Sequence, residues 1–368
     1  MLDFLVYNRG LSNLPLLFSV EEGRKHTFDV MVLDAEYLPS YYKEPSRLFD
    51  LSARNVCTSN RQPLFPECWS TQAAFLKHLY DPILRPEGKR LYGVPIRFGF
   101  QEPLLNERMA NRLQRRCSKE SLCYLDIAPL QVAQQDPSVK LIFWDWHLPS
   151  ISVLLLTAGV PLDKVTSCGR KEIEEILHPL TNDKTISRRC VFLDTLEEID
   201  RQIHSDIDMV IYGVPGTSFL GSRSYSAKAP DAQRIVPIRS KKEGVFVWCE
   251  VAALQAGSSQ SGSTLQDLKP RPEAVDVLTH WLSAETQMHL ANQKPLASLT
   301  PAQGTLRQLL QQQERPENLR TLLEIVDPHD LELLPDAKVL PRMMPEDPMR
   351  AQEWVDCWSE FKKAAHAS

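Results

Sequence analysis

No stretch of the 368-residue sequence approaches 18 consecutive apolar residues, so the sequence predicts no transmembrane helix. The longest apolar-rich run, residues 151–160, has the length of a core element. The formal net charge is only −5, which provides no basic footprint for binding nucleic acid. Because the apolar content of 43% and the charged content of 24% are ordinary, we expect a globular protein that binds no nucleic acid.

The chain also lacks the common signatures of catalysis. It has no Cys-x2-Cys pair, no serine or cysteine within a nucleophile motif, and no phosphate-binding loop. We therefore expect no enzyme activity, no cofactor and no metal. The eight cysteines lie far apart, and a Cys57–Cys68 or Cys117–Cys123 disulfide remains open in an oxidising compartment.

Residues 1–23 lack the basic segment, apolar core and small-residue cleavage site of a signal peptide. Three explanations stay open: a mature or truncated form, a start assigned too far downstream, or a protein that remains inside the cell. The chain length suggests two to three domains, and we expect two lobes.

The most informative stretch is residues 236–254, where a basic loop leads into a strictly alternating strand. Because strand side chains alternate with period two, Trp248 and Glu250 lie on the same face. An indole beside a carboxylate suits an organic cation, which the ring attracts by its face and the acid by charge. The alternative is that Trp248 belongs to the core and that Glu250 lies at a solvated strand end.

Residues 28–33 form an apolar run that predicts a buried parallel strand. Ligands of α/β sheets bind beyond the carboxyl ends of strands, which places Asp34, Glu36 and Tyr37 at a candidate site. The alternative for either acid is that it caps the next helix.

Residues 91–99 predict another strand, in which Pro95 requires an edge or a bend. Arg97 within it would bind a ligand anion or close a salt bridge between lobes, and we favour the bridge.

A strand over residues 139–145 and a helix over 149–159 flank a loop that carries Asp145, Trp146 and His147. This loop and Tyr212, at the end of a strand over 208–214, are further candidates for a ligand cleft. Other expected elements are helices over 73–84, 171–177, 195–204 and 274–290, a strand over 190–193, and a packing face made by Trp354, Trp358 and Phe361.

From residue 28 to residue 363 the chain resembles the spermidine/putrescine-binding branch of the ABC-transporter solute receptors. The resemblance rests on many weak motifs in the right order and on two stronger ones, an EG-x3-W-x-[DE]-x2-A strand and a closing segment at residues 334–363. The strand motif is met by Glu243, Gly244, Trp248, Glu250 and Ala253.

The resemblance implies an α/β, two-lobed type II periplasmic-binding-protein fold with two crossover strands and a central ligand cleft. Residues 1–98 and 243–303 would form the first lobe, for which a truncated N-terminal part stays open, and residues 99–242 and 304–368 the second lobe with the C-terminal helix. By resemblance, Trp248, Glu250 and Tyr212 line the cleft. A monomer would capture a polyamine-like or other amine-bearing solute and present it to ABC permease subunits outside the cytoplasmic membrane.

Two departures qualify this expectation. The two carboxylates that hold an amine in the polyamine receptors are replaced by Trp146 and Pro149, with Asp145 one residue earlier, and the first lobe is short at its start. Two alternatives therefore stay open. One is an anionic or other ligand held by Arg97 and Lys241 or Lys242, and the other is an intracellular sensory or interaction protein.

Overall fold

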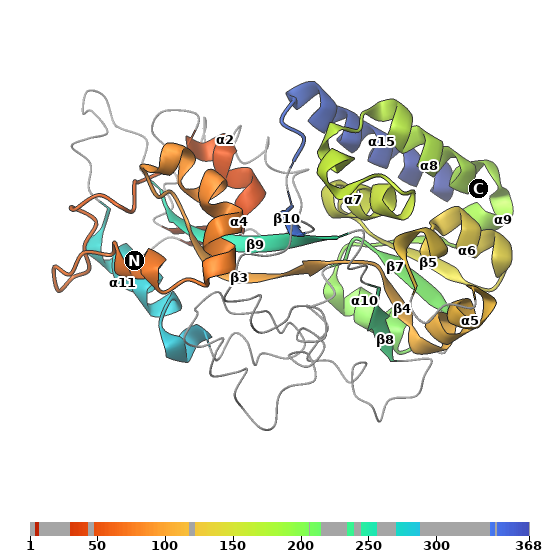
Figure 1. Cartoon of the computed structure of the whole chain (residues 1–368), viewed down its shortest axis with the longest axis horizontal. Helices are drawn as coiled ribbons and strands as arrows, with labels where there is room; N and C mark the ends of the chain where they lie inside the picture. The colour runs from red at the N-terminus through yellow and green to blue at the C-terminus, as the bar shows by residue number, and fades with distance from the viewer. Residues whose placement is uncertain are drawn as a thin grey trace.

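A computed structural model describes residues 4–6, 30–42, 48–117, 122–205, 207–214, 234–238, 244–255, 270–287, 339–342 and 344–367. These residues form two five-stranded sheets, each covered by helices, and two long strands run across the middle of the molecule (Figure 1). The fold is therefore the expected two-lobed α/β architecture of the type II class.

The first sheet is organised around the ten-residue strand β9. Its strands are β1 (Phe4–Val6), β2 (Val30–Asp34), β3 (Val94–Gln101), β9 (Val245–Leu254) and β10 (Val339–Pro341). Strand β3 runs antiparallel to β9 along one edge, whereas β2 (antiparallel) and β10 (parallel) share the other edge. The neighbouring helices are α2 (Leu38–Tyr42), α3 (Glu67–Ser70), α4 (Ala74–Leu84) and α11 (Pro272–Trp281).

The second sheet has the strand order β6-β5-β7-β4-β8. Its strands are β4 (Leu104–Asn106), β5 (Lys140–Trp144), β6 (Cys190–Leu193), β7 (Met209–Tyr212) and β8 (Ile235–Pro237). Strands β5, β6 and β7 are parallel, as expected for strands joined by helical crossovers. Its helices are α5 (Glu107–Cys117), α6 (Pro129–Gln135), α7 (His147–Thr157), α8 (Arg170–Asn182), α9 (Lys184–Ser187), α10 (Leu196–Ile203) and α15 (Pro348–His366).

Among the described elements, three successive pairs connect one sheet to the other. Strand β3 leads into β4, the chain returns between β8 and β9, and β10 leads into α15. Strands β3 and β9 are the expected crossover strands (Figure 1). Short 3-10 turns complete the described elements: η2 (Ala35–Tyr37), η3 (Pro86–Gly88), η4 (Tyr124–Ile127) and η5 (Leu162–Ser167).

Local sequence signals explain most of these elements. Pro95 lies at a register shift in β3, and among the described strands β3 pairs only with β9, so both the bend and the edge are present. Helix α15 begins with Pro348 in its first turn, and the Asp347 carboxylate accepts a hydrogen bond from Met349 N at 3.0 Å. Its predicted packing face is confirmed, because Trp354, Trp358 and Phe361 are buried.

The helix expected over residues 274–290 differs from the prediction. Helix α11 ends at Trp281, and residues 284–287 begin a new helical turn. The Ser283 hydroxyl accepts a hydrogen bond from Thr286 N at 3.3 Å, which caps this new turn and explains the interruption. Residues 288–290 lie outside the described residues.

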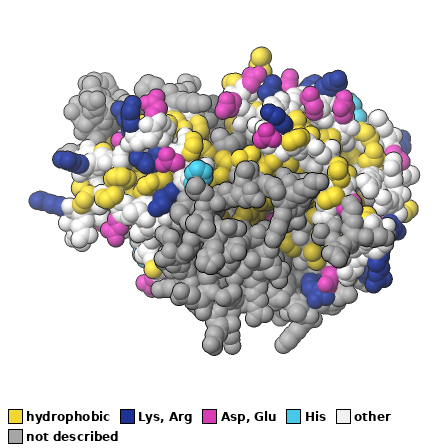
Figure 2. Space-filling model, in the orientation of Figure 1, with side chains coloured by type: hydrophobic (Ala, Val, Ile, Leu, Met, Phe, Trp, Pro, Cys, Tyr) yellow, Lys and Arg dark blue, Asp and Glu magenta, His cyan; other side chains and the backbone are white. Residues whose placement is uncertain are grey.

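All eight cysteines are free thiols, so neither the Cys57–Cys68 nor the Cys117–Cys123 disulfide is present. On the face shown in Figure 2, acidic and basic side chains are interspersed over the described part of both lobes. This distribution fits the modest net charge of the sequence.

Candidate functional site

The carboxyl ends of β2 and β10 approach each other along one edge of β9. Strand β2 ends at Asp34, opposite Glu250, and β10 ends at Pro341, opposite Val247. The next residue after β10, Arg342, donates its backbone N–H to the Val247 carbonyl at 2.7 Å. Strand ends are where α/β sheets carry their ligand sites, so this meeting point is the candidate site.

The Arg342 side chain fills the meeting point and is only 1% exposed. Its Nε donates to Glu36 Oε1 at 2.7 Å, and its Nη2 lies 3.2 Å from Asp34 Oδ2. Its Nη1 donates to Gln101 Oε1 at 3.3 Å. The guanidinium also lies over the Trp146 ring, 4.7 Å from the ring centroid. A fully buried cation is thereby paired with two acids and one aromatic face.

A second charged pair lies beside the first. Arg97 is opposite Glu250 in the register of β3 and β9, and its Nε and Nη2 each donate to one oxygen of that carboxylate. This two-pronged geometry is the strongest form of an arginine–carboxylate pair. The expected Arg97 salt bridge thus joins two strands of one sheet and not the two lobes. The reason is that its partner is the cross-strand neighbour on the same face.

Carboxylates outnumber cations in this charge cluster, which consists of Asp34, Glu36, Arg97, Glu250 and Arg342. Among the described residues, three acids meet two guanidinium groups. Burial, followed by repulsion from Glu36, raises the pKa of Asp34 well above its usual value, although Arg342 opposes the shift. Burial likewise raises the pKa of Glu36. The cluster therefore favours either a bound proton or an additional cation.

Aromatic rings border the charge cluster. Tyr37 stacks against Trp146, with ring centroids 6.3 Å apart, and Trp248 on β9 is 5% exposed. The Trp248 indole N–H and Glu36 Oε2 are buried and have no hydrogen-bond partner among the described residues. Such buried polar atoms usually find a partner, so they point to water or ligand in this region.

Two candidate residues lie elsewhere. Tyr212 is fully buried in the second lobe, where its hydroxyl donates to the Ile127 carbonyl at 2.8 Å and its ring stacks on Phe143. Asp145 accepts from Lys362 Nζ at 2.6 and 2.9 Å and from Trp358 Nε1 at 3.1 Å. These contacts hold the second lobe together, so we leave both residues out of the proposed ligand set.

His147, beside Asp145, begins α7 and is partly buried. Burial, reinforced by the nearby Lys362 charge, lowers the pKa of His147 to about 4. The ring is therefore neutral at physiological pH.

Sequence reasoning missed Arg342 and Gln101. The Gln101 amide donates to the Gly213 carbonyl at 3.2 Å, which connects the end of β3 to the loop after β7. An arginine inside the apolar stretch of residues 339–344 was the one available signal for Arg342. Lys241 and Lys242 lie outside the described residues.

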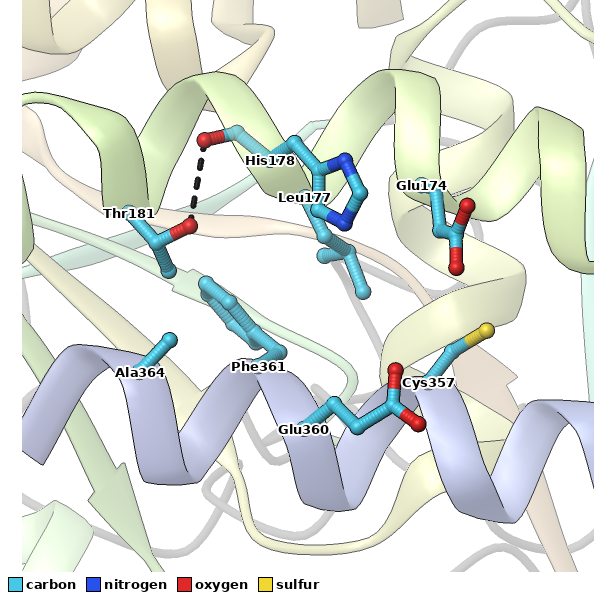
Figure 3. Close-up of a pocket in the computed structure, with 8 residues that line it drawn as sticks. All are labelled: Glu174, Leu177, His178, Thr181, Cys357, Glu360, Phe361 and Ala364. Carbon is cyan, nitrogen blue, oxygen red and sulfur yellow. Dashed lines mark hydrogen bonds between the residues drawn. The ribbon is translucent and has the colours of Figure 1, made fainter.

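A separate pocket lies between α8 and α15 in the second lobe (Figure 3). Its acids are already engaged, because Glu174 and Glu360 both accept hydrogen bonds from Arg170 at 2.9 Å. Within the described part of the chain, no group of three or more His, Cys, Asp or Glu side chains has an arrangement that could hold a metal ion. Likewise, none of the described helices combines the length and apolarity needed to cross a membrane.

No family model matches the sequence, and no curated protein matches it. Solved structures do resemble it. The spermidine/putrescine ABC transporter substrate-binding protein PotD from Streptococcus pneumoniae is 14% identical with a TM-score of 0.59, covering 96% of this chain and 89% of that one. The TpPotD lipoprotein of Treponema pallidum is 12% identical with a TM-score of 0.57, covering 96% and 88%.

The periplasmic binding protein MotA from A. tumefaciens B6, solved in complex with glucopine, is 14% identical with a TM-score of 0.54. The match covers 96% of this chain and 87% of that one. At such identities the likeness establishes fold and not ligand. The chain therefore has the two-lobed type II fold found in ABC-transporter substrate-binding proteins of the spermidine/putrescine kind.

Proposed function

We propose that this protein is a solute-binding protein of an ABC importer that captures an amine-bearing small solute between its two lobes. The observation that carries the proposal is the charge cluster, where three carboxylates meet two guanidinium groups among the described residues. A positively charged amine would neutralise the remaining charge. Neutralisation inside a buried site contributes more to affinity than the same contact made in water.

The proposed ligand set combines acids with aromatic walls. Asp34 and Glu250 are the cluster carboxylates that retain some exposure, with side chains 17% and 13% exposed. Trp248 lies two residues before Glu250 on the same strand face, and Tyr37 and Trp146 stack nearby. This set, with Glu36 behind it, suits a ligand that carries both methylene groups and an ammonium group.

The solved neighbours support this class of ligand without specifying it. PotD is a spermidine/putrescine substrate-binding protein and another neighbour is a GABA receptor, and each of these compounds carries an amine. Another neighbour was solved with maltose bound, so the fold also accommodates ligands without charge. The amine is therefore assigned from the charge cluster of this chain.

An anionic ligand held by Arg97 is less well supported. Both Arg97 nitrogens that face Glu250 already donate to that carboxylate, which neutralises the guanidinium. An anion would have to compete with Glu250 and approach Asp34 as well. Repulsion from these acids disfavours that mode.

The proposal includes a location outside the cytoplasmic membrane and docking of the ligand-bound form onto permease subunits. The neighbours of known structure include an ABC-transporter substrate-binding protein and a lipoprotein. Reading the DNA upstream of Met1 tests this part. An in-frame export signal and adjacent permease and ATPase genes would support it, and their absence would favour an intracellular role.

Calorimetric titration tests the ligand class. The panel contains spermidine, putrescine, γ-aminobutyrate, neutral amino acids and organic acids. We expect saturable heat with an amine, and at least a tenfold weaker dissociation constant in Glu250→Gln, because a charge-assisted contact contributes about 1.5 to 3 kcal/mol. Glu175→Gln, the same substitution at an exposed position on α8, serves as the matched control and should bind like the wild type. Silence with every amine, or binding of organic acids alone, would reject the proposal.

A further inference from the structure

The surroundings of Arg342 have the composition of a binding site for a free guanidinium compound. Glu36 accepts a hydrogen bond from its Nε and Gln101 accepts one from its Nη1, while Asp34 Oδ2 forms an ion pair with its Nη2 at 3.2 Å. The Cζ atom of the guanidinium lies over the Trp146 ring, 4.7 Å from the ring centroid. Several acceptors around the group, together with an indole ring beside it, suit a guanidinium better than an ammonium ion. The reason is that a guanidinium is planar and carries five N–H donors, whereas an ammonium ion is a compact point charge.

The groups around Arg342 come from three separate strand ends, and Arg342 comes from a fourth. Asp34 ends β2 and Glu36 follows it, Gln101 ends β3, Trp146 follows β5, and Arg342 itself follows β10. Strands β2, β3 and β10 belong to the first sheet, whereas β5 belongs to the second. The guanidinium therefore lies where the carboxyl ends of the two sheets face each other, which is where α/β proteins bind ligands.

The backbone presents this side chain from a short connection. Arg342 directly follows β10, and its N–H is held by the Val247 carbonyl. Arg342 is anchored to the crossover strand β9 through its backbone. Its side chain therefore binds at the site without the loss of translational entropy that a free ligand would suffer. A tethered group of this kind outcompetes free ligands through its high effective concentration.

We propose that Arg342 is a tethered ligand, a cation supplied by the chain itself that fills a guanidinium site built from Asp34, Glu36, Gln101 and Trp146 and thereby holds the two lobes together. Removing the side chain should leave a site that accepts a free alkylguanidinium. This inference concerns the group that occupies the guanidinium site, whereas the proposed function concerns an amine ligand of the wild type. The inference is tested on a variant that lacks the arginine side chain, so one hypothesis can be rejected while the other stands.

Chemical rescue of Arg342→Ala tests the inference. Ethylguanidinium is the probe, because it carries the atoms that this substitution removes. We expect saturable binding by calorimetry and a rise of about 2 °C in Tm at tenfold the dissociation constant. The wild type should show neither, because its own arginine fills the site. Ethylamine, which has the charge without the planar fork, should bind at least tenfold more weakly.

Arg112→Ala is the matched control. Arg112 also pairs with two acids, Asp136 and Asp208, but its side chain is one-third exposed and both acids precede strands of the second sheet. We expect no rescue of this variant by ethylguanidinium. Equal responses of both variants, or of the wild type, would overturn the proposal.

A second measurement reports on the two lobes. Small-angle scattering should show a larger radius of gyration for Arg342→Ala than for the wild type, with the compact value restored by ethylguanidinium. If the variant does not fold alone, it is refolded from urea with ethylguanidinium or with sodium chloride at equal concentration. Recovery with the guanidinium compound alone supports the tethered ligand, and equal recovery or none refutes it.

Discussion

Asp34 and Glu250 lie directly opposite each other on the antiparallel strands β2 and β9. Two acids at such a position repel each other, and sheets usually avoid this pairing. Here Arg97 flanks Glu250 on β3, and Arg342 reaches Asp34 from the end of β10. Across the sheet the row therefore consists of a cation, two adjacent acids and a second cation, and each substitution within it has a predictable sign.

Asp34→Asn should stabilise the protein at neutral pH by up to about 1 kcal/mol, because it removes the like-charge pair while keeping a polar side chain. The pKa of the native Asp34 carboxyl is raised by burial and by Glu36, so the folded state holds its proton more tightly than the unfolded state. Stability of the wild type is therefore lost as the pH rises from about 4 through the native pKa. In urea unfolding between pH 4 and 8, the free energy of unfolding should fall less with rising pH in Asp34→Asn than in the wild type.

The control for this prediction is Asp163→Asn, at a side chain that is 66% exposed. The stability of this variant should depend on pH in the same way as that of the wild type. A wild-type protein whose stability rises steadily across this range, with Asp34→Asn showing no difference, would contradict the prediction.

Acidification should expose an opposing effect at His147. Burial, with help from Lys362, lowers the native pKa of His147 to about 4, whereas an unfolded histidine titrates near 6.5. The unfolded state therefore binds the proton first, and stability falls as the pH drops below about 6.5. Between pH 7 and 5 the loss amounts to about 2 kcal/mol.

His147→Gln should remove this acid-dependent loss, which urea unfolding at pH 7 and pH 5 would measure. His78→Gln alters an exposed histidine and should leave the pH profile as in the wild type. If both variants lost the same stability as the wild type between pH 7 and 5, His147 would not be the responsible group.

Arg97→Met should destabilise the protein by about 3 kcal/mol, because it leaves the Glu250 carboxylate half-buried and facing Asp34 without its cation. Adding Glu250→Gln to this variant should restore much of the loss, since the unpaired charge is then removed. Urea unfolding of the four proteins in this double-mutant cycle should give a coupling energy of about 1 to 3 kcal/mol. Additive effects would mean that the pair contributes nothing beyond its separate side chains.

Gly213→Ala should destabilise the second lobe by several kcal/mol. Gly213 has a φ of +85°, and an added Cβ would lie 2.7 Å from Ser150 Cα and 2.8 Å from Ser150 N. These are backbone atoms of α7, which cannot move without displacing the helix. The Gly213 carbonyl also accepts the Gln101 hydrogen bond, so the guanidinium site around Arg342 should be disturbed as well.

Gly88→Ala provides the comparison, because Gly88 has a φ of +67° but an added Cβ would meet nothing within 4 Å. Its expected cost is the left-handed backbone alone, about 1 kcal/mol. Thermal unfolding of the two variants measures the difference. Equal destabilisation would show that backbone strain, and not contact with α7, limits position 213.

Local sequence patterns predicted much of the fold. Strand alternation placed Trp248 and Glu250 on one face of β9, and the spacing of Trp354, Trp358 and Phe361 identified the buried face of α15. These signals work because periodicity reports which side of a strand or helix is buried. They identify the buried face of an element, but they do not identify the residues that pack against it.

The charge cluster could not be predicted from such local signals. Glu36 is a candidate from its place after a strand, but its partner Arg342 lies 306 residues away in sequence. Asp145 similarly pairs with Lys362 across 217 residues and supports the second lobe, although its loop suggested a ligand. Each side chain alone is compatible with a cap, a salt bridge or a ligand contact.

By itself, the sequence determined the alternation of β9, the strand ends that carry acids, and the order of elements that gives a two-lobed fold. Only the tertiary structure decided that β2 and β10 end beside each other on one edge of β9, bringing Asp34, Glu36 and Arg342 together. The physical reason is that burial patterns are set by neighbouring residues, whereas charge pairing depends on which distant strand ends meet in a low-dielectric interior.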